Sequence, residues 1–190
     1  MISEKRLAAE AATQFVKNGM IVGLGTGSTV QYAIKKLGVM VRDGLSIKCI
    51  PTSDSTKDLA EKEGIKLIDF SETMYIDLTI DGADEIDSDL NMIKGGGAAL
   101  LREKIVAFAS REEIIIVSSE KYVRRLGKFP LPVEVIPFGW QQTFNYLEKL
   151  GANPNLRLFQ GNPLLTDQKN FIIDCSFREI KNVEALEQRL

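Results

Sequence analysis

The sequence predicts an α/β fold in which a Rossmann-like parallel sheet, flanked by helices, is followed by a smaller α+β lobe. Two observations support this fold class. Short apolar runs of strand length alternate with segments of helical periodicity through residues 1–127. From Lys128 onwards, prolines interrupt an extended run, which is unsuited to a helix. We therefore expect a large catalytic α/β domain over residues 1–127 and a small α+β lobe over residues 128–190.

The elements of the large domain follow one another along the chain. Ser3 can cap a first helix that carries apolar residues at helical spacing up to Val16, and Gly19 suits its end. Further helices are expected to include residues 30–37, 55–63 and 97–110. Buried strands are expected at residues 20–24, 46–50, 65–68, 76–80 and 113–117. This alternation implies a parallel sheet, in which ligands collect where strands end and loops begin.

The small lobe combines short strands with two helices. After an extended segment at residues 129–137, a helix is expected at 140–150 and a turn at Asn153-Pro154. Strand-like segments at 156–159 and 171–175 are separated by Gly161-Asn162-Pro163, and a last helix follows Arg178.

The composition of the 190-residue chain excludes several classes of function. A net charge of −2 with scattered basic residues gives no electrostatic footprint for nucleic acid or an anionic membrane. No apolar run approaches the roughly 20 residues of a membrane span, so we expect a cytoplasmic protein. Cys49 and Cys175 are expected to be core thiols. Because the chain holds no histidine, any proton transfer must use a carboxylate or a lysine.

Two hydroxyl-rich loops follow expected strands. The turn Gly25-Thr26-Gly27-Ser28-Thr29 suits a phosphate at a helix N-terminus, although a capped turn without a ligand explains it equally well. It lacks the lysine ending of a P-loop, and Ser28 replaces the third glycine of a dinucleotide motif, so a dinucleotide is disfavoured. The second loop, at residues 51–57, is expected only to cap the next helix through Asp54 or Ser55.

An acidic segment follows another expected strand. The carboxylates of Asp81 and Asp84 suit the hydroxyl groups of a small ligand. A divalent-metal site is the rival interpretation, because hard cations favour several oxygen ligands. The calcium-loop pattern does not fit, since Asp87 and Asp89 lack the following glycine and the distal glutamate. We therefore expect Glu85, Asp87 and Asp89 on a wet surface.

A glycine run, Lys94-Gly95-Gly96-Gly97, comes next and would let the backbone approach a ligand closely. Glu103 lies beyond it on an expected helix with apolar residues one turn away on both sides, and partial burial would suit it to proton transfer. Arg102 also has apolar neighbours, so an internal ion pair of the glutamate with an arginine or a lysine explains the pattern too. Lys121 follows another strand end and either reaches the same crevice or is solvated.

From the first helix to about Cys175, the sequence closely resembles the type A ribose-5-phosphate isomerases. The resemblance rests on Gly-Thr-Gly-Ser-Thr at 25–29, Asp-Gly-Ala-Asp-Glu at 81–85, the segment at 94–104 and the proline-rich segment at 126–135. It implies an aldose–ketose isomerase that interconverts ribose 5-phosphate and ribulose 5-phosphate through an enediol or enediolate. It also implies a place in the non-oxidative pentose phosphate pathway, no metal or organic cofactor, and a homodimer or homotetramer.

The resemblance also implies residue roles. Glu103 matches the proton-transferring base, Lys94 a site lysine, and Asp81 and Asp84 the acids that bind the sugar and assist ring opening. The substrate-binding residues that it implies are Lys5, Thr26, Gly27, Ser28, Thr29, Asp81, Gly82, Ala83, Asp84, Lys94, Gly95, Gly96, Gly97 and Lys121.

Two other functions share features with this pattern, and one departure stands out. A sugar-phosphate-sensing effector domain would bind a similar ligand without turnover, but it would lack the base that Glu103 supplies. A CoA-transferase-like protein would share a glutamate nucleophile, but not the 25–29 and 81–84 motifs. The isomerases continue beyond the last helix with a return segment, whereas this sequence ends at Leu190. We expect the lack of that segment to affect stability, oligomerisation and activity.

Overall fold

The computed structural model describes residues 3–190 and divides them into two compact units. The first unit holds the residues up to Gly82 together with Ala99–Ser119, and the second holds Ala83–Ala98 together with Glu120–Leu190. The sequence places a single boundary after residue 127, whereas the chain passes between the units three times. Segment 83–98 belongs to the second unit, where Ile93 packs with Leu126 and Ile180.

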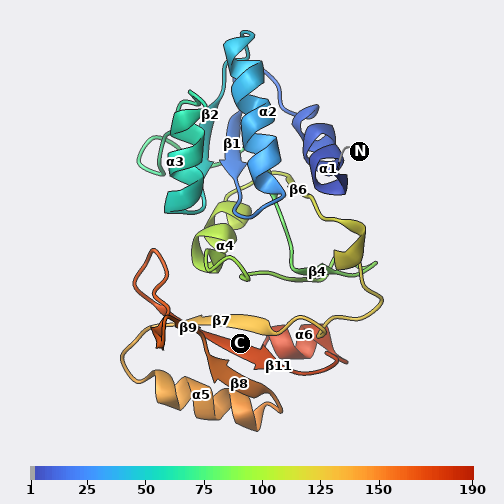
Figure 1. The fold of residues 1–190 in the computed structure, drawn as a ribbon, viewed down its shortest axis with the longest axis vertical. Helices are drawn as coiled ribbons and strands as arrows, with labels where there is room; N and C mark the ends of the chain where they lie inside the picture. The colour runs from blue at the N-terminus through green and yellow to red at the C-terminus, as the bar shows by residue number, and fades with distance from the viewer. Residues whose placement is uncertain (1–2) are drawn as a thin grey trace. The chain divides into compact units, whose positions relative to one another are not determined.

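The first unit is built on a four-stranded parallel sheet in the order β2-β1-β3-β6, which confirms the predicted fold class. Its strands are β1 (Ile21–Leu24), β2 (Lys48–Pro51), β3 (Leu78–Asp81) and β6 (Glu113–Ile115). Its helices are α1 (Glu4–Thr13), α2 (Val30–Arg42), α3 (Asp54–Lys62) and α4 (Leu100–Phe108). In Figure 1, α2 lies in front of β1, with α1 and α3 on either side of it.

Apolar side chains are buried on both faces of this sheet. Consecutive residues of a strand point to opposite faces, and Cys49 and Ile50 of β2 accordingly join different clusters. The cluster around Cys49 includes Leu37 of α2, while Ile50 packs with Ile76 and with Val106 of α4. Burial on both faces explains why the strands read as short continuous apolar runs.

The strand order brings the carboxyl ends of β1 and β3 together. β1 pairs with β2 on one side and with β3 on the other, where Leu24 lies opposite Ile80. After β1 the chain forms β2 on one side of β1, and it later forms β3 on the opposite side. In open parallel sheets ligands bind at such a reversal, outside the carboxyl ends of the strands. The turn at 25–29 and Asp81 both lie there.

One expected strand, at residues 65–68, is reduced to a single bridge between Leu67 and Cys49. The N–H of Ile68 donates to the carbonyl oxygen of Cys49 at 2.9 Å, so this segment does run beside β2. A turn at Asp69, whose carboxylate accepts the N–H of Ser71, follows at once and ends the pairing. The apolar residues of segment 65–68 therefore pack in the core without adding a strand to the sheet.

The second unit contains a three-stranded antiparallel sheet in the order β7-β11-β8, which confirms the α+β character of the small lobe. These strands are β7 (Leu131–Val135), β8 (Asn153–Leu156) and β11 (Phe171–Ser176). Helix α5 (Trp140–Lys149) contacts β8 and β11, and Figure 1 shows it alongside β8. The smaller elements are β4 (Glu85–Ile86), β5 (Met92–Ile93), η1 (Ser119–Lys121), β9 (Leu158–Phe159), β10 (Asn162–Pro163) and α6 (Val183–Glu187).

The expected turn at Asn153-Pro154 is wrong, because both residues lie in β8. Pro154 pairs with Cys175 of β11, at the edge of the three-stranded sheet. Proline has no N–H to give to a sheet ladder, and an edge strand tolerates this because one side needs no partner. Proline near asparagine is typical of turns, so sequence alone favoured the turn.

Both cysteines are buried free thiols, as the sequence predicts. Burial raises the pKa of the Cys49 thiol from 9.0 to about 12, because a poorly polar environment disfavours the thiolate. Burial, and then the nearby charge of Asp174, raises the pKa of Cys175 to about 12 as well.

These raised pKa values predict a loss of stability at alkaline pH. Between about pH 9 and 12 the unfolded chain releases thiol protons that the native chain keeps, so the free energy of unfolding falls as the pH rises. Urea unfolding at a series of pH values measures this fall. Replacing Cys49 and Cys175 by alanine should make the fall shallower, and an unchanged slope in that variant would contradict the assignment.

Candidate functional site

Asp81 organises the turn that follows β1. Its carboxylate is 0% exposed, and Oδ1 accepts the N–H of Thr26 at 3.1 Å and the N–H of Gly82 at 2.7 Å. Gly25 packs directly against it: a Cβ on Gly25 would lie 2.0 Å from Asp81 Oδ1. Glycine is therefore required at position 25 because Asp81 lies too close to leave room for a side chain. Asp81 also holds the turn through the N–H of Thr26.

The hydroxyl of Thr26 points into a network of hydroxyl groups inside the first unit. Its Oγ1 lies 2.7 Å from the hydroxyl of Thr52 and 3.2 Å from that of Thr56, and it donates to Ser53 Oγ at 2.8 Å. Thr56 in turn donates to the carbonyl oxygen of Gly25 at 2.8 Å. The second hydroxyl-rich loop therefore holds the first loop in place.

The cap of α3 is Ser53, whereas the sequence favoured Asp54 or Ser55. Ser53 has an extended backbone, and its Oγ accepts the N–H of Thr56 at 3.0 Å. Asp54 is already the first helical residue, so it lies one position too late to cap. The loop is thus more than a cap, because the same Ser53 hydroxyl also accepts from Thr26.

A lysine and a serine meet at the N-terminal end of α2. Lys5, on α1, donates from Nζ to Ser28 Oγ at 3.0 Å. Gly27 and Ser28 are exposed, and Thr29, which precedes the helix, is buried. An ammonium group, an exposed hydroxyl and the positive end of a helix dipole together favour an anion such as a phosphate.

Glu103 and Arg102 are neighbours on α4 with different surroundings. Glu103 is 4% exposed, in keeping with the apolar residues one turn away from it. Arg102 is partly exposed and donates from Nη1 to Asp54 Oδ1 of α3 at 2.8 Å. Glu103 is thus buried, as its apolar neighbours predict, while the neighbouring Arg102 pairs with Asp54 of α3.

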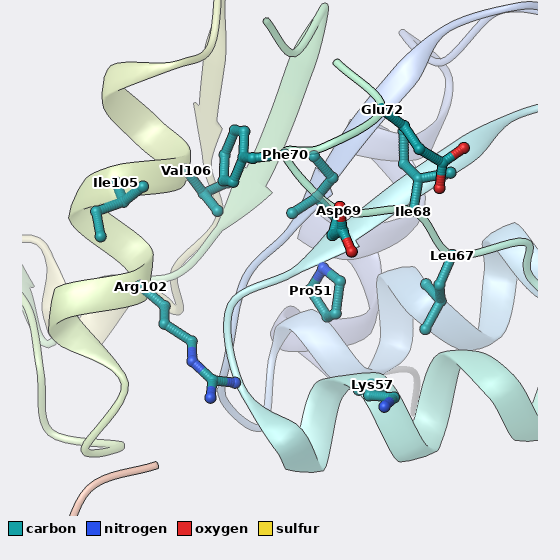
Figure 2. A pocket seen from close by; sticks show the side chains of 11 residues that line it. Pro51, Lys57, Leu67, Ile68, Asp69, Phe70, Glu72, Arg102, Ile105 and Val106 are labelled. Atoms are coloured by element: carbon teal, nitrogen blue, oxygen red, sulfur yellow. The ribbon is translucent and has the colours of Figure 1, made fainter. Parts of the chain in front are cut away.

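The first unit also has a pocket of about 500 Å³. Figure 2 shows Arg102 and Ile105 of α4 and Lys57 of α3 around it. Its lining is Ile50, Pro51, Lys57, Leu67, Ile68, Asp69, Phe70, Glu72, Arg102, Ile105 and Val106. None of the expected site residues lines this pocket, so it is distinct from the groups around Asp81 and Ser28.

In the second unit, Asp84 is bound from two directions. Its Oδ2 accepts the N–H of Gly96 at 2.7 Å, and its Oδ1 lies 3.6 Å from Lys121 Nζ. Lys121 also donates to the carbonyl oxygen of Ala83 at 3.0 Å. These contacts bring together Asp84, Ala83, Lys121 and the glycine run, all of which the sequence marked as candidates.

The glycine run follows the short strand β5, with Lys94 as its first residue. Gly95 has φ of 101°, a left-handed conformation that side chains disfavour, and a Cβ on Gly96 would lie 2.6 Å from Asp84 Oδ1. Gly97 is exposed. The run therefore needs glycine both for its backbone conformation and for its close approach to Asp84.

The expectation that Glu85 and Asp87 lie on a wet surface is wrong, whereas Asp89 is exposed as expected. Glu85 is 3% exposed and accepts the N–H groups of Gly127 and Phe129 at 2.8 and 2.6 Å. Asp87 is also buried and accepts backbone N–H groups within its own turn. These carboxylates are buried because long-range and local backbone donors satisfy them.

Glu85→Ala is expected to lower the free energy of unfolding by about 2 kcal/mol, because the buried N–H of Gly127 and the partly buried N–H of Phe129 would lose their acceptor. Urea denaturation measures the change. The matched control is Asp89→Ala, which removes an exposed carboxylate from the same segment and should change stability by less than about 0.5 kcal/mol. Equal losses in the two variants would contradict a structural role for Glu85.

Within residues 3–190, no group of three or more Asp, Glu or Cys side chains is arranged to hold a metal ion. Over the same range, no helix is long and apolar enough to cross a membrane.

Comparison with known proteins decides the family. The family model described as ribose 5-phosphate isomerase A (phosphoriboisomerase A) matches residues 48–190. The chain is 54% identical over 177 residues to ribose-5-phosphate isomerase A of Bacillus mycoides (strain KBAB4), which covers 93% of this chain and 80% of that protein. The chain belongs to the ribose-5-phosphate isomerase A family. The protein of the same name from Listeria monocytogenes serovar 1/2a is 51% identical over 191 residues, covering 100% of this chain and 85% of its own.

Solved structures of this family have the same fold. A D-ribose-5-phosphate isomerase in complex with phospho-erythronic acid superposes with a TM-score of 0.95 at 40% identity, covering 98% of this chain and 84% of that chain. The ribose 5-phosphate isomerase A of Methanocaldococcus jannaschii gives a TM-score of 0.93 at 39% identity, covering 97% and 84%. The family and fold class inferred from the motifs are confirmed.

Several residues of this family member contact the candidate site residues but carried no recognisable sequence signal. Thr52, Ser53 and Thr56 form the hydroxyl network behind Thr26, although only a helix cap was expected there. Arg157 binds the carbonyl oxygens of the glycine run from a position about 60 residues further along the chain. A single arginine between two leucines has no local signature, so only the folded chain reveals its contacts.

Proposed function

We propose that this chain interconverts D-ribose 5-phosphate and D-ribulose 5-phosphate, with Glu103 as the base that moves the proton. Membership of the ribose-5-phosphate isomerase A family supports the reaction. The observation that supports the base is the burial of Glu103, which is 4% exposed on α4. A carboxylate shielded from water is suited to take and return a proton, and the chain has no histidine for this step.

The reaction needs one base that reaches two adjacent carbons. In the open-chain aldose, the Glu103 carboxylate takes the proton from C2, a double bond forms between C1 and C2, and the electrons of the C1 carbonyl move onto O1. The proton of the O2 hydroxyl passes to O1, and a carbonyl forms at C2. Glu103 then returns its proton to C1, which completes the ketose with all atoms balanced.

Negative charge on O1 and O2 must be stabilised while the enediolate exists. Lys94 carries the positive charge assigned to this task, and the backbone of Gly95, Gly96 and Gly97 cradles the substrate. General base catalysis contributes about 10²–10⁴-fold, so orientation and charge stabilisation supply the remainder of the acceleration.

The phosphate of the substrate is assigned to the turn before α2. The exposed Gly27 and Ser28, the buried Thr29 and the ammonium group of Lys5 support this assignment. Thr26 contributes by holding the turn in place, since its hydroxyl donates to Ser53 and its N–H donates to Asp81.

The sugar hydroxyls are assigned to Asp81 and Asp84, together with the backbone of Gly82 and Ala83. Asp81 is held by the N–H groups of Thr26 and Gly82, and Asp84 by Gly96 and Lys121. Carboxylates held in this way keep a fixed orientation towards hydroxyl donors. The same two acids are proposed to assist opening of the sugar ring.

The chain is further proposed to act in the cytoplasm as a homodimer or homotetramer, without a metal or organic cofactor and without nucleic-acid or membrane partners. Its two buried free thiols suit a reducing compartment. Leu101, Ile105 and Phe108 form an exposed apolar stripe on α4, which supports self-association. Sedimentation analysis tests this, and a monomer at micromolar concentration would contradict it.

The deciding experiment is the formation of ribulose 5-phosphate from ribose 5-phosphate by the purified chain in excess EDTA. Turnover in EDTA, with little or none on ribose that lacks the phosphate, is the expected result. Calorimetric binding of ribose 5-phosphate without turnover would instead indicate a sensing domain and would overturn the proposal.

A further inference from the structure

An arginine of the second unit is built into the support of the glycine run. Arg157 lies between β8 and β9, and its side chain is 16% exposed. It donates from Nε to Asp174 Oδ2 at 2.8 Å and from Nη2 to Asp174 Oδ1 at 2.5 Å. This paired, two-bond contact fixes the plane of the guanidinium group.

The partner of Arg157 is itself held by the sheet. Asp174 lies on β11, the central strand, between the two buried residues Ile173 and Cys175. The backbone N–H of Arg157 also donates to the carbonyl oxygen of Ile172 at 2.8 Å. Both ends of the ion pair are thus anchored in the folded core of the unit.

The remaining nitrogen of Arg157 reaches the glycine run. Nη1 donates to the carbonyl oxygens of Gly95 and Gly96 at 3.2 and 3.1 Å. The carbonyl of Gly95 and the N–H of Gly96 belong to one trans peptide group and point in opposite directions. On that opposite side the N–H of Gly96 donates to Asp84 Oδ2 at 2.7 Å. This peptide is therefore held between Arg157 and Asp84.

The same geometry orients the next peptide group. Because Arg157 binds the carbonyl of Gly96, the N–H of Gly97 in that group points away from the guanidinium. Gly97 is exposed, so its N–H lies in a segment that a ligand can approach.

We propose that Arg157, anchored by Asp174, is a positioning residue of the isomerase. It orients the glycine run so that the N–H of Gly96 fixes Asp84 and the N–H of Gly97 is presented to the substrate. This inference rests on the proposed function, because it assigns Arg157 to the support of groups that bind the sugar phosphate. An ion pair that only stabilised the small sheet would not need the two bonds to Gly95 and Gly96.

The test compares Arg157→Lys and Arg157→Met with matched changes at Arg125. Lysine keeps the charge but lacks the planar fork whose separate nitrogens reach Asp174 and the two carbonyls, and methionine keeps an unbranched stem without donors. Arg125 pairs with Glu179 at an exposed position of the same unit, without contact to the glycine run. Three quantities are measured: kcat and KM for ribose 5-phosphate, Tm, and hydrogen exchange of the Gly96 amide in the ligand-free protein.

Both Arg157 variants are expected to lose roughly 100-fold in kcat/KM, as a displacement near 1 Å of substrate-binding groups would cause. The Gly96 amide should exchange faster in them, while the Arg125 variants keep wild-type values. Unchanged kcat/KM and Gly96 protection in folded Arg157→Lys would overturn the proposal, and so would equal losses at Arg125. If Arg157→Met fails to fold, the lysine variant decides.

A failure of the proposed function can be distinguished from a failure of the positioning role, because the first is measured by wild-type turnover and the second by exchange of the Gly96 amide. A wild-type chain that does not isomerise ribose 5-phosphate would overturn that function, and the role of Arg157 would then be judged by Gly96 exchange alone. Unchanged exchange in Arg157→Lys would overturn the positioning role in that case too.

Discussion

Glu103→Gln is expected to lower kcat for ribose 5-phosphate isomerisation by about 10²–10⁴-fold, the usual contribution of a general base. Glutamine has nearly the same shape but cannot accept a proton from carbon. The position is 4% exposed on α4, so the neutral amide should be accommodated and the fold kept. KM should change much less than kcat, because the lost interaction belongs to the chemical step. Initial-rate kinetics over a range of ribose 5-phosphate concentrations measure both constants.

The matched control for this variant is Glu61→Gln. It makes the same chemical change at an exposed position on α3 and should keep wild-type kcat and KM. Thermal unfolding of Glu103→Gln checks that the variant is folded. A folded Glu103→Gln protein with wild-type kcat would show that another group moves the proton.

Gly25→Ala is expected to disrupt the turn after β1 and to lower both stability and activity. The added Cβ would lie 2.0 Å from Asp81 Oδ1 and 2.7 Å from the backbone Cα of Asp81. Since a backbone atom cannot rotate away, the turn or β3 must shift, at a cost of about 1–3 kcal/mol. The midpoint of thermal unfolding should fall by roughly 2–12 °C. Displacement of the turn by about 1 Å would cost about 10²-fold in kcat/KM.

Gly82→Ala supplies the steric control for this prediction. A Cβ on Gly82 would meet nothing closer than the carbonyl oxygen of Ile116 at 3.7 Å, which is an ordinary contact. Its stability should change by less than about 1 kcal/mol. A Gly25→Ala protein as stable as Gly82→Ala would show that Asp81 does not pack on the turn as described.

Local patterns in the sequence predicted most of the first unit. Strands and helices alternate there because each buried strand is a short apolar run and each helix has one apolar face. The turn at Gly25 and the carboxylate of Asp81 were predictable because glycine, hydroxyl and acidic residues follow these strands directly. Glu103 was predictable because its apolar neighbours recur at helical spacing, and the structure buries it.

Contacts between distant segments could not be predicted from local patterns. Glu85 is buried because Gly127 and Phe129, more than 40 positions further along, donate to it. Arg157 supports the glycine run from the segment between β8 and β9, and its sequence neighbourhood contains no repeated or spaced motif. Pro154 lies in a strand because the edge of the small sheet tolerates proline. In each case the partner is set by the tertiary fold.

Glu103 is proposed to remove the proton from C2 of ribose 5-phosphate, and this step can be followed directly. Proton NMR in D2O, with EDTA present, measures directly the rate at which the C2 proton signal of the substrate disappears. We expect rapid loss with the wild-type chain and loss slowed by about 10²–10⁴-fold with Glu103→Gln, at nearly unchanged affinity for the substrate. Loss of the C2 proton at the wild-type rate in folded Glu103→Gln would contradict this proposal.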